Sequence, residues 1–278
     1  MPSAGKPFII DDSTPTGDLF APVVDGELKG RGYDPSSVDP IVKSSFGAPP
    51  SEMKLIPRSE WDARIDEQEE LGSSLEHFRK TMNNGQMHAS LDQNGQGFCW
   101  YYSITATAMY ARAVAHLPYV RFSPHAGACK VKNFRDEGGW CGLSAKHARE
   151  FGFVPEAFWP QKSMSRENDT PATWAEASKY KIVEDWVDLT KNVYDQNLTF
   201  DQVATCLLLN IPCAVDFNWW SHSVCAIRLV RVEAGSYGLK IHNSWTDNWG
   251  ENGMGILRGS KSIPDGAVAT RAIGTLAA

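Results

Sequence analysis

Long hydrophobic runs are missing from this chain of 278 residues. The first twelve residues hold one apolar triplet, at 8–10, closed by two aspartates, so the sequence predicts neither an export signal nor a membrane span. Positive charge is also scarce, because 27 Lys and Arg face 33 Asp and Glu, and no segment forms a cationic stripe. Because of this charge distribution we expect no nucleic-acid partner. Because an export signal is missing, we expect a chain that is made in the cytoplasm.

Cysteine pairs with the spacing of a metal site are absent as well. The six cysteines include no C-x-x-C and the seven histidines are scattered, so we expect no zinc and no other cofactor. Without an export signal, free thiols are expected rather than disulfides. The composition that remains, 42% hydrophobic and 22% charged, is typical of a globular protein with a sizeable core.

The first 54 residues differ from the rest in composition. Eight of the sixteen prolines lie here, and no window keeps a helical or strand period. We therefore predict an extended arm over 1–54 and a folded domain over 55–278. The arm carries many prolines and lacks the apolar i, i+3, i+4 spacing that a packed helix needs, so we expect it to bind another protein. A virus particle or a phage tail is the kind of assembly that such an arm suggests.

Helices come first in the domain and strands later, which indicates an α+β fold. Residues 99–114 contain one charge and neither glycine nor proline, which predicts a helix buried on nearly all sides. Further helices are expected at 74–82, at 143–151, from 171, and from 203 after a capping box at 199–202. Strands are expected at 213–218, 223–232, 237–243 and 253–258.

Cys99 stands where a polar, glycine-containing loop enters the buried helix. A thiol at a helix N-terminus faces unpaired N–H groups and the positive end of the helix dipole, and both favour the thiolate. Strands 223–232 and 237–243 form a predicted hairpin, which brings His222 and Asn243 to the same open end. This arrangement predicts nucleophilic catalysis in which Cys99 attacks, His222 is the base and Asn243 orients the imidazole.

These residues lie in motifs that resemble the papain family of cysteine peptidases. The segments that carry the resemblance are Gln93 with Cys99-Trp100, Gly138-Gly139-Trp140, Ser221-His222-Ser223-Val224, the block from Asn243-Ser244-Trp245 to Gly250-Glu251-Asn252-Gly253, and Ile56 to Arg64. They follow the family's order along 55–278.

The resemblance implies two subdomains, a helical one at about 86–185 and an antiparallel β one at about 186–278. It implies peptide or protein substrates, an oxyanion hole made by Gln93 and the Cys99 N–H, and shielding of the His–Asn hydrogen bond by Trp245. The substrate-binding residues that it implies are Gly138, Gly139, Trp140, Asp216 and Ser221. The Asp216 carboxylate is expected to select a basic side chain two residues before the cut.

The chain also departs from the family. The positions of one family disulfide carry Gln96 and Asp136, Cys129 has no cysteine between 142 and 205 to pair with, and the segment 216–220 replaces a longer loop. Two other functions therefore stay open. One is a structural or assembly protein that keeps the fold, and the other is a Cys–His hydrolase of cell-wall amides.

Overall fold

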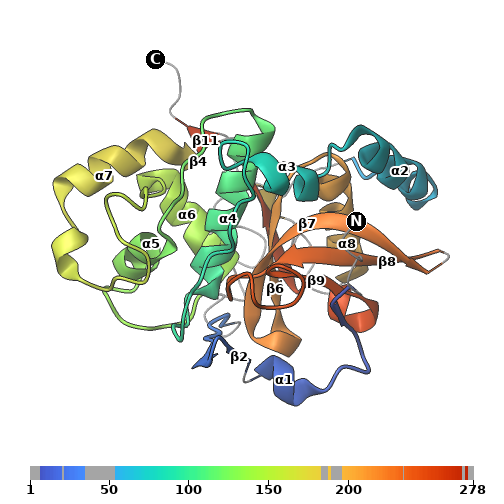
Figure 1. Cartoon of the computed structure of the whole chain (residues 1–278), viewed down its shortest axis with the longest axis horizontal. Coiled ribbons are helices and arrows are strands. Elements are labelled where there is room, and N and C mark those ends of the chain that lie inside the picture. The colour runs from blue at the N-terminus through green and yellow to red at the C-terminus, as the bar shows by residue number, and fades with distance from the viewer. Residues whose placement is uncertain are drawn as a thin grey trace.

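A computed structural model describes residues 7–20, 22–34, 54–182, 187–188, 196–233, 235–270 and 273–274. Much of the predicted junction between arm and domain, and the predicted junction of the subdomains near 185, lie outside these ranges. Figure 1 shows α4 (Cys99–Val114), α5 (Pro124–Val131), α6 (Cys141–Phe151) and α7 (Pro171–Ala177) on one side of the molecule and the sheet, flanked by further helices, on the other, so the α+β fold is confirmed. None of the described helices is long and apolar enough to cross a membrane.

The helical half is built around α4 (Cys99–Val114), which is buried from Cys99 to Arg112 as the sequence predicted. The other helices of this half are α3 (Leu75–Thr81), α5, α6 and α7, whereas α2 (Trp61–Leu71) packs on the sheet half against β7 (His222–Glu233). Three of them, α3, α5 and α6, pack against α4. Sequence patterns did not predict α2, because its buried face consists of Trp61, Ile65 and the polar Gln68.

The sheet half has seven strands in the order β1-β9-β8-β7-β6-β10-β5. They are β1 (Ile9–Ile10), β5 (Val187–Asp188), β6 (Cys213–Phe217), β7 (His222–Glu233), β8 (Ser236–His242), β9 (Met254–Leu257) and β10 (Gly266–Ala269). All neighbours are antiparallel except β1, which runs parallel to β9. Two short pairs, β4 (Lys181–Ile182) with β11 (Ile273–Gly274) and β2 (Val23–Val24) with β3 (Glu27–Leu28), complete the strands described.

Helix α8 (Gln196–Leu208) packs on the sheet against β6, β7 and β10. It begins before the capping box predicted at 199–202, so that prediction of the helix start is wrong. Thr199 and Gln202 are buried within the helix instead of closing its end. The same helix ties down the beginning of the domain, since the Thr205 hydroxyl accepts from the N–H of Ile56 at 3.1 Å.

The described part of the arm is folded onto its own domain. Besides β1 and the β2–β3 hairpin it contains α1 (Thr16–Phe20), and Ile10, Leu19 and Val24 are buried. Trp220 Nε1 donates to the Leu19 carbonyl at 3.0 Å. The prediction of an extended arm is therefore wrong for these segments, and binding of the arm to another protein stays a prediction. Single apolar residues are enough to anchor these segments, and such residues leave no period in the sequence.

Candidate active site

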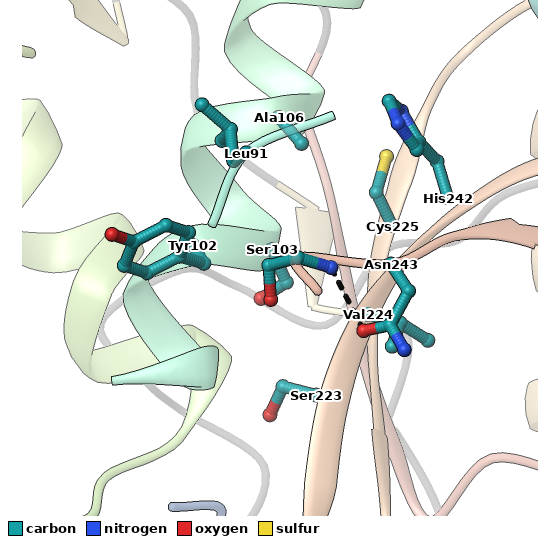
Figure 2. Close-up of a pocket in the computed structure, with 10 residues that line it drawn as sticks. Leu91, Tyr102, Ser103, Ala106, Ser223, Val224, Cys225, His242 and Asn243 are labelled. Carbon is teal, nitrogen blue, oxygen red and sulfur yellow. Dashed lines mark hydrogen bonds between the residues drawn. The ribbon is translucent and has the colours of Figure 1, made fainter. Parts of the chain in front are cut away.

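His222 and Asn243 meet at the open end of the β7–β8 hairpin, as predicted. The register pairs Cys225 with His242, and this pairing places His222 and Asn243 near each other at the end of the hairpin. His222 Nε2 lies 2.8 Å from Asn243 Oδ1, and this oxygen also accepts from the Ser244 N–H at 2.8 Å, the dashed line in Figure 2. His222 Nδ1 has no hydrogen-bond partner among the described residues, so it is the nitrogen left for a thiol proton.

Two indole rings cover the imidazole. Trp245 stacks on His222 with centroids 4.4 Å apart and an interplanar angle of 24°, and Trp220 makes a T-shaped contact with it at a centroid distance of 4.8 Å. Trp245 thus lies where a shield was expected, whereas the sequence did not indicate Trp220. Burial lowers the pKa of His222 to about 3, although the hydrogen bond with Asn243 opposes this shift.

Cys99 is the first residue of α4 and is fully buried. Its Sγ accepts from the backbone N–H of Gly32 at 3.1 Å. Burial raises the pKa of Cys99 to about 12, although hydrogen bonds from Ser223 and Gly32 lower it. The sequence predicted a thiolate from the helix N-terminus, but here the loss of water outweighs that effect, and both the thiol and the imidazole are neutral.

The side-chain amide of Gln93, the predicted oxyanion-hole donor, binds a carbonyl of the arm. Gln93 Nε2 donates to the carbonyls of Gly30 at 2.8 Å and Gln96 at 2.9 Å. Its Oε1 accepts from the Ser244 hydroxyl at 2.5 Å. Trp245 Nε1 donates to the same Gly30 oxygen at 3.1 Å. An arm carbonyl therefore occupies the amide that is predicted to donate to the oxyanion.

Three of the predicted substrate-binding residues also contact the arm. Gly139 donates to the Gly32 carbonyl at 2.8 Å, and its own carbonyl accepts from the Asp34 N–H at 3.0 Å. The Ser221 carbonyl accepts from Tyr33 at 3.2 Å, and a side chain at Gly138 would meet the Gly32 oxygen. Residues 30–34 thus lie in the candidate site of their own chain, which the sequence did not predict.

Two arm glycines make this close approach possible. A Cβ at Gly30 would collide with the carbonyl of Gln96, and one at Gly32 with the carbonyl of Gly97. Between them Arg31 donates to the Trp220 carbonyl at 2.8 Å. The alternation of glycines at 30 and 32 was the only trace of this arrangement in the sequence.

Asp216 and Trp140 differ from the other predicted substrate contacts. The Asp216 carboxylate is buried and accepts from the N–H of Cys141 at 3.2 Å, the thiol of Cys141 at 2.9 Å and the hydroxyl of Ser223. These donors belong to the protein itself, so the expected selection of a basic side chain loses its support. Trp140 is half-buried just before α6, and its role in substrate binding stays a prediction.

A cavity of about 10 Å³ lies behind Asn243, between α4 and the strands β7 and β8 (Figure 2). Its lining includes Tyr102, Ser103, Ser223 and His242. This volume is close to that of one water molecule and cannot hold a substrate side chain.

No protein-family model matches this sequence, and no curated protein sequence does either. Solved structures resemble it in fold. Xylellain, a cysteine protease from Xylella fastidiosa, is 17% identical with a TM-score of 0.55, and the match covers 90% of this chain and 98% of that one. Procathepsin B S9 from Trypanosoma congolense is 14% identical with a TM-score of 0.51, covering 89% and 87%.

A third similar structure is the digestive procathepsin L2 of Tenebrio molitor larval midgut, 21% identical with a TM-score of 0.52. The match covers 66% of this chain and 64% of that one, so the chain matches less than two thirds of that protein's length. Similarity at these identities concerns the fold. With the helical half, the antiparallel sheet half and the motif order described above, it shows that this chain has the papain-like fold.

Proposed function

We propose that this protein is a cysteine peptidase that its own N-terminal arm keeps latent. The observation that carries the proposal is that the expected catalytic groups converge on one arm segment. Gln93 binds the Gly30 carbonyl and Cys99 accepts from Gly32. Trp245, which covers the His222–Asn243 pair, donates to the same Gly30 carbonyl.

Hydrolysis would begin when a substrate carbonyl replaces that of Gly30. His222 Nδ1 takes the thiol proton, and Cys99 Sγ attacks the carbonyl carbon to form a tetrahedral intermediate. Gln93 Nε2 and the Cys99 N–H stabilise the oxyanion, and the imidazolium then gives its proton to the leaving amine. Water hydrolyses the acyl-enzyme with His222 as the base again. Asn243 accepts from Nε2–H throughout and so fixes the tautomer.

The arm itself is a poor substrate because of the group that it presents. An amide N–H, not a carbonyl carbon, faces the Cys99 sulfur, so attack has no electrophile. The arm also excludes water, which keeps the thiolate and the imidazolium unfavourable. Displacement of residues 30–34 removes both obstacles.

The other functions predict different products. An assembly protein with this fold would show no turnover even with its arm displaced, and a cell-wall hydrolase would cut muropeptides but not proteins. Residence in a larger assembly such as a virus particle or a phage tail stays a prediction, and the described arm segments do not support it, since they contact their own domain.

The test compares the Gly32→Ala chain with the Gly32→Ala/Cys99→Ala chain. Both are incubated with a broad mixture of fluorogenic peptides, with muropeptides and with an epoxide thiol trap. We expect peptide hydrolysis and trapping at Cys99 in the first chain and neither in the second. Trapping with cleavage of muropeptides alone would favour the amide hydrolase, and the loss of both signals in the first chain would favour the assembly protein.

A further inference from the structure

A buried polar cluster that the proposed mechanism does not use lies beside the candidate site. Ser90 is at its centre, and its hydroxyl donates to Asp247 Oδ1 at 2.6 Å. Ser90 Oγ also lies 2.7 Å from His242 Nε2, and Tyr110 Oη lies 2.9 Å from His242 Nδ1. Arg79 donates to Asp247 at 2.8 Å and to Ser90 Oγ at 3.2 Å. We call these five residues the Ser90 cluster; all are buried except Asp247, whose side chain is 33% exposed.

The hydrogen bonds of the cluster run in one direction. The Ser90 hydroxyl gives its one hydrogen to the Asp247 carboxylate, so its oxygen accepts from His242 Nε2. Burial lowers the pKa of His242 well below its usual value, so the ring is neutral and its Nδ1 accepts from the Tyr110 hydroxyl. Every hydroxyl and ring nitrogen in the cluster therefore has a partner, and buried networks of this kind are rigid.

The cluster is joined to elements that carry expected catalytic groups. Tyr110 lies on α4, the helix that begins at the expected nucleophile. His242 ends β8 and directly precedes Asn243, and Figure 2 shows the two side chains pointing in opposite directions. Ser90 packs on the turn that binds Asn243, because the Gly253 carbonyl accepts from the Asn243 N–H at 2.9 Å and a Cβ at Gly253 would collide with Ser90 Oγ.

Two chain segments near the site pair as a short antiparallel ladder. At one end the N–H of Gln93 donates to the Ser244 carbonyl at 3.0 Å, and the Ser244 hydroxyl binds the Gln93 side chain. Further along, the N–H of Thr246 donates to the Leu91 carbonyl at 3.2 Å. Two backbone hydrogen bonds are a weak hold on the register of such a pair.

The Ser90 cluster closes the other end of this ladder. Ser90 and Asp247 stand one register step beyond the last backbone pair, and the Ser90 N–H donates to Asp247 Oδ1 at 2.9 Å, where a backbone carbonyl would accept in a longer ladder. The same carboxylate holds the Ser90 hydroxyl and the Arg79 guanidinium. Opening of this end would leave Gln93 free to shift relative to Asn243.

We propose that the Ser90 cluster is a positioning device, which fixes the register of the ladder and thereby holds the Gln93 amide where it donates to the oxyanion. Its residues act through Gln93 and touch neither the substrate nor the reacting atoms. The cluster matters most once the arm has left, because Gln93 Nε2 then loses its bond to the Gly30 carbonyl. The effect on turnover rests on the proposed peptidase function, whereas the hold on the ladder does not.

Kinetics in the arm-displaced Gly32→Ala chain provide the first test. Asp247→Ala removes the carboxylate, and Asn248→Ala is the matched control, because the Asn248 side chain donates to Asp25 of the arm and to no member of the cluster. We expect Asp247→Ala to lower kcat about tenfold with little change in KM, which is less than the roughly 10²-fold cost of losing an oxyanion donor outright. The control should keep its kcat. Asp247→Asn should recover most of the loss, since its amide oxygen still accepts from Ser90.

A double-mutant cycle with Gln93→Ala separates positioning from a general loss of structure. If the cluster acts through Gln93, Asp247→Ala should cost nothing further in a chain that already lacks the Gln93 amide. Independent effects would multiply to about 10³-fold, and that result would overturn the proposal. If the unpaired Arg79 guanidinium keeps Asp247→Ala from folding, Arg79→Met/Asp247→Ala removes both charges and takes its place in the cycle.

Hydrogen exchange reports on the ladder without any turnover. When Asp247→Ala is added to the arm-displaced chain, the amides of Gln93 and Thr246 should exchange at least about tenfold faster, while the amides of β7 keep their rates. Unchanged exchange at these two amides would refute the hold on the ladder, whatever the kinetics. Faster exchange in an arm-displaced chain that cuts no peptide would sink the peptidase and leave the role of the cluster in place.

Discussion

Replacement of Gly32 by alanine tests whether the arm holds the site inactive. The added Cβ would collide with the backbone of Gly97, which no side-chain rotation can relieve. Gly32 is also the residue that donates to Cys99 and accepts from Gly139. We therefore expect residues 30–34 to leave the site, while the pairing of β1 with β9 keeps the earlier part of the arm in place.

The size of the expected effect follows from the free energy that holds residues 30–34 in the site. Eight hydrogen bonds join residues 30–34 to the domain, each with a net contribution of about 1 kcal/mol. Burial of the Tyr33 ring adds about 2 kcal/mol. Ordering the five residues costs about 1.5 kcal/mol each. About 2–3 kcal/mol remains, which corresponds to a closed state favoured roughly 10²-fold over the open one.

The assay is the initial rate of peptide hydrolysis by the wild type, Gly32→Ala and Gly17→Ala. A Cβ at Gly17, in α1 of the same arm, meets nothing within 4 Å, so this variant is the matched control. Only the open fraction can bind substrate, so we expect Gly32→Ala to be about 10²-fold faster and Gly17→Ala to be unchanged. A wild-type rate equal to that of Gly32→Ala would refute the reasoning.

The remaining predictions concern the catalytic groups and the hold on the arm. In the arm-displaced chain, Gln93→Ala should lower kcat about 10²-fold in steady-state kinetics, and an unchanged kcat would remove it from the oxyanion hole. Asn243→Ala should lower kcat with little effect on KM, because the imidazole loses its orienting acceptor; a change in KM alone would contradict this. Although burial raises it, hydrogen bonds from Lys162 and Lys29 lower the pKa of Asp92. The Lys29–Asp92 ion pair therefore persists at neutral pH and is lost as the pH falls through that lowered value, so hydrogen exchange at the amides of Gly30 and Gly32 should accelerate below about pH 4 relative to exchange in β7.

Motif order and hairpin geometry were enough to predict much of the site. Cys99 lies at the start of a helix buried on nearly all sides, because a run of apolar and small residues without breakers has few other solutions. His222 and Asn243 meet because a hairpin brings its two ends together, whatever the rest of the fold does. Both inferences depend on local sequence and on chemistry that tolerates few residue types.

The position of the arm could not be predicted in the same way. Its order comes from tertiary contacts of isolated apolar residues such as Leu19 and Val24, which local periodicity does not register. The prediction that Cys99 is a thiolate failed for a related reason. The helix N-terminus is visible in the sequence, but the burial that raises the pKa of the thiol involves a segment near residue 32, far along the chain.

Latency in this arrangement has a steric and an electrostatic part, and reagent size separates them. Burial raises the pKa of Cys99 from 9.0 to about 12, so the reactive thiolate fraction at neutral pH is about 10³ lower than that of an ordinary thiol. Even if a small reagent such as iodoacetamide fits past the arm sterically, it still reacts slowly because the Cys99 thiol is neutral. We therefore expect iodoacetamide and a bulky epoxide both to label the wild type far more slowly than Gly32→Ala, with Cys99→Ala as the blank. If iodoacetamide labelled Cys99 equally fast in both chains while the epoxide did not, the arm would act as a lid alone, and the neutral thiol would contribute nothing to latency.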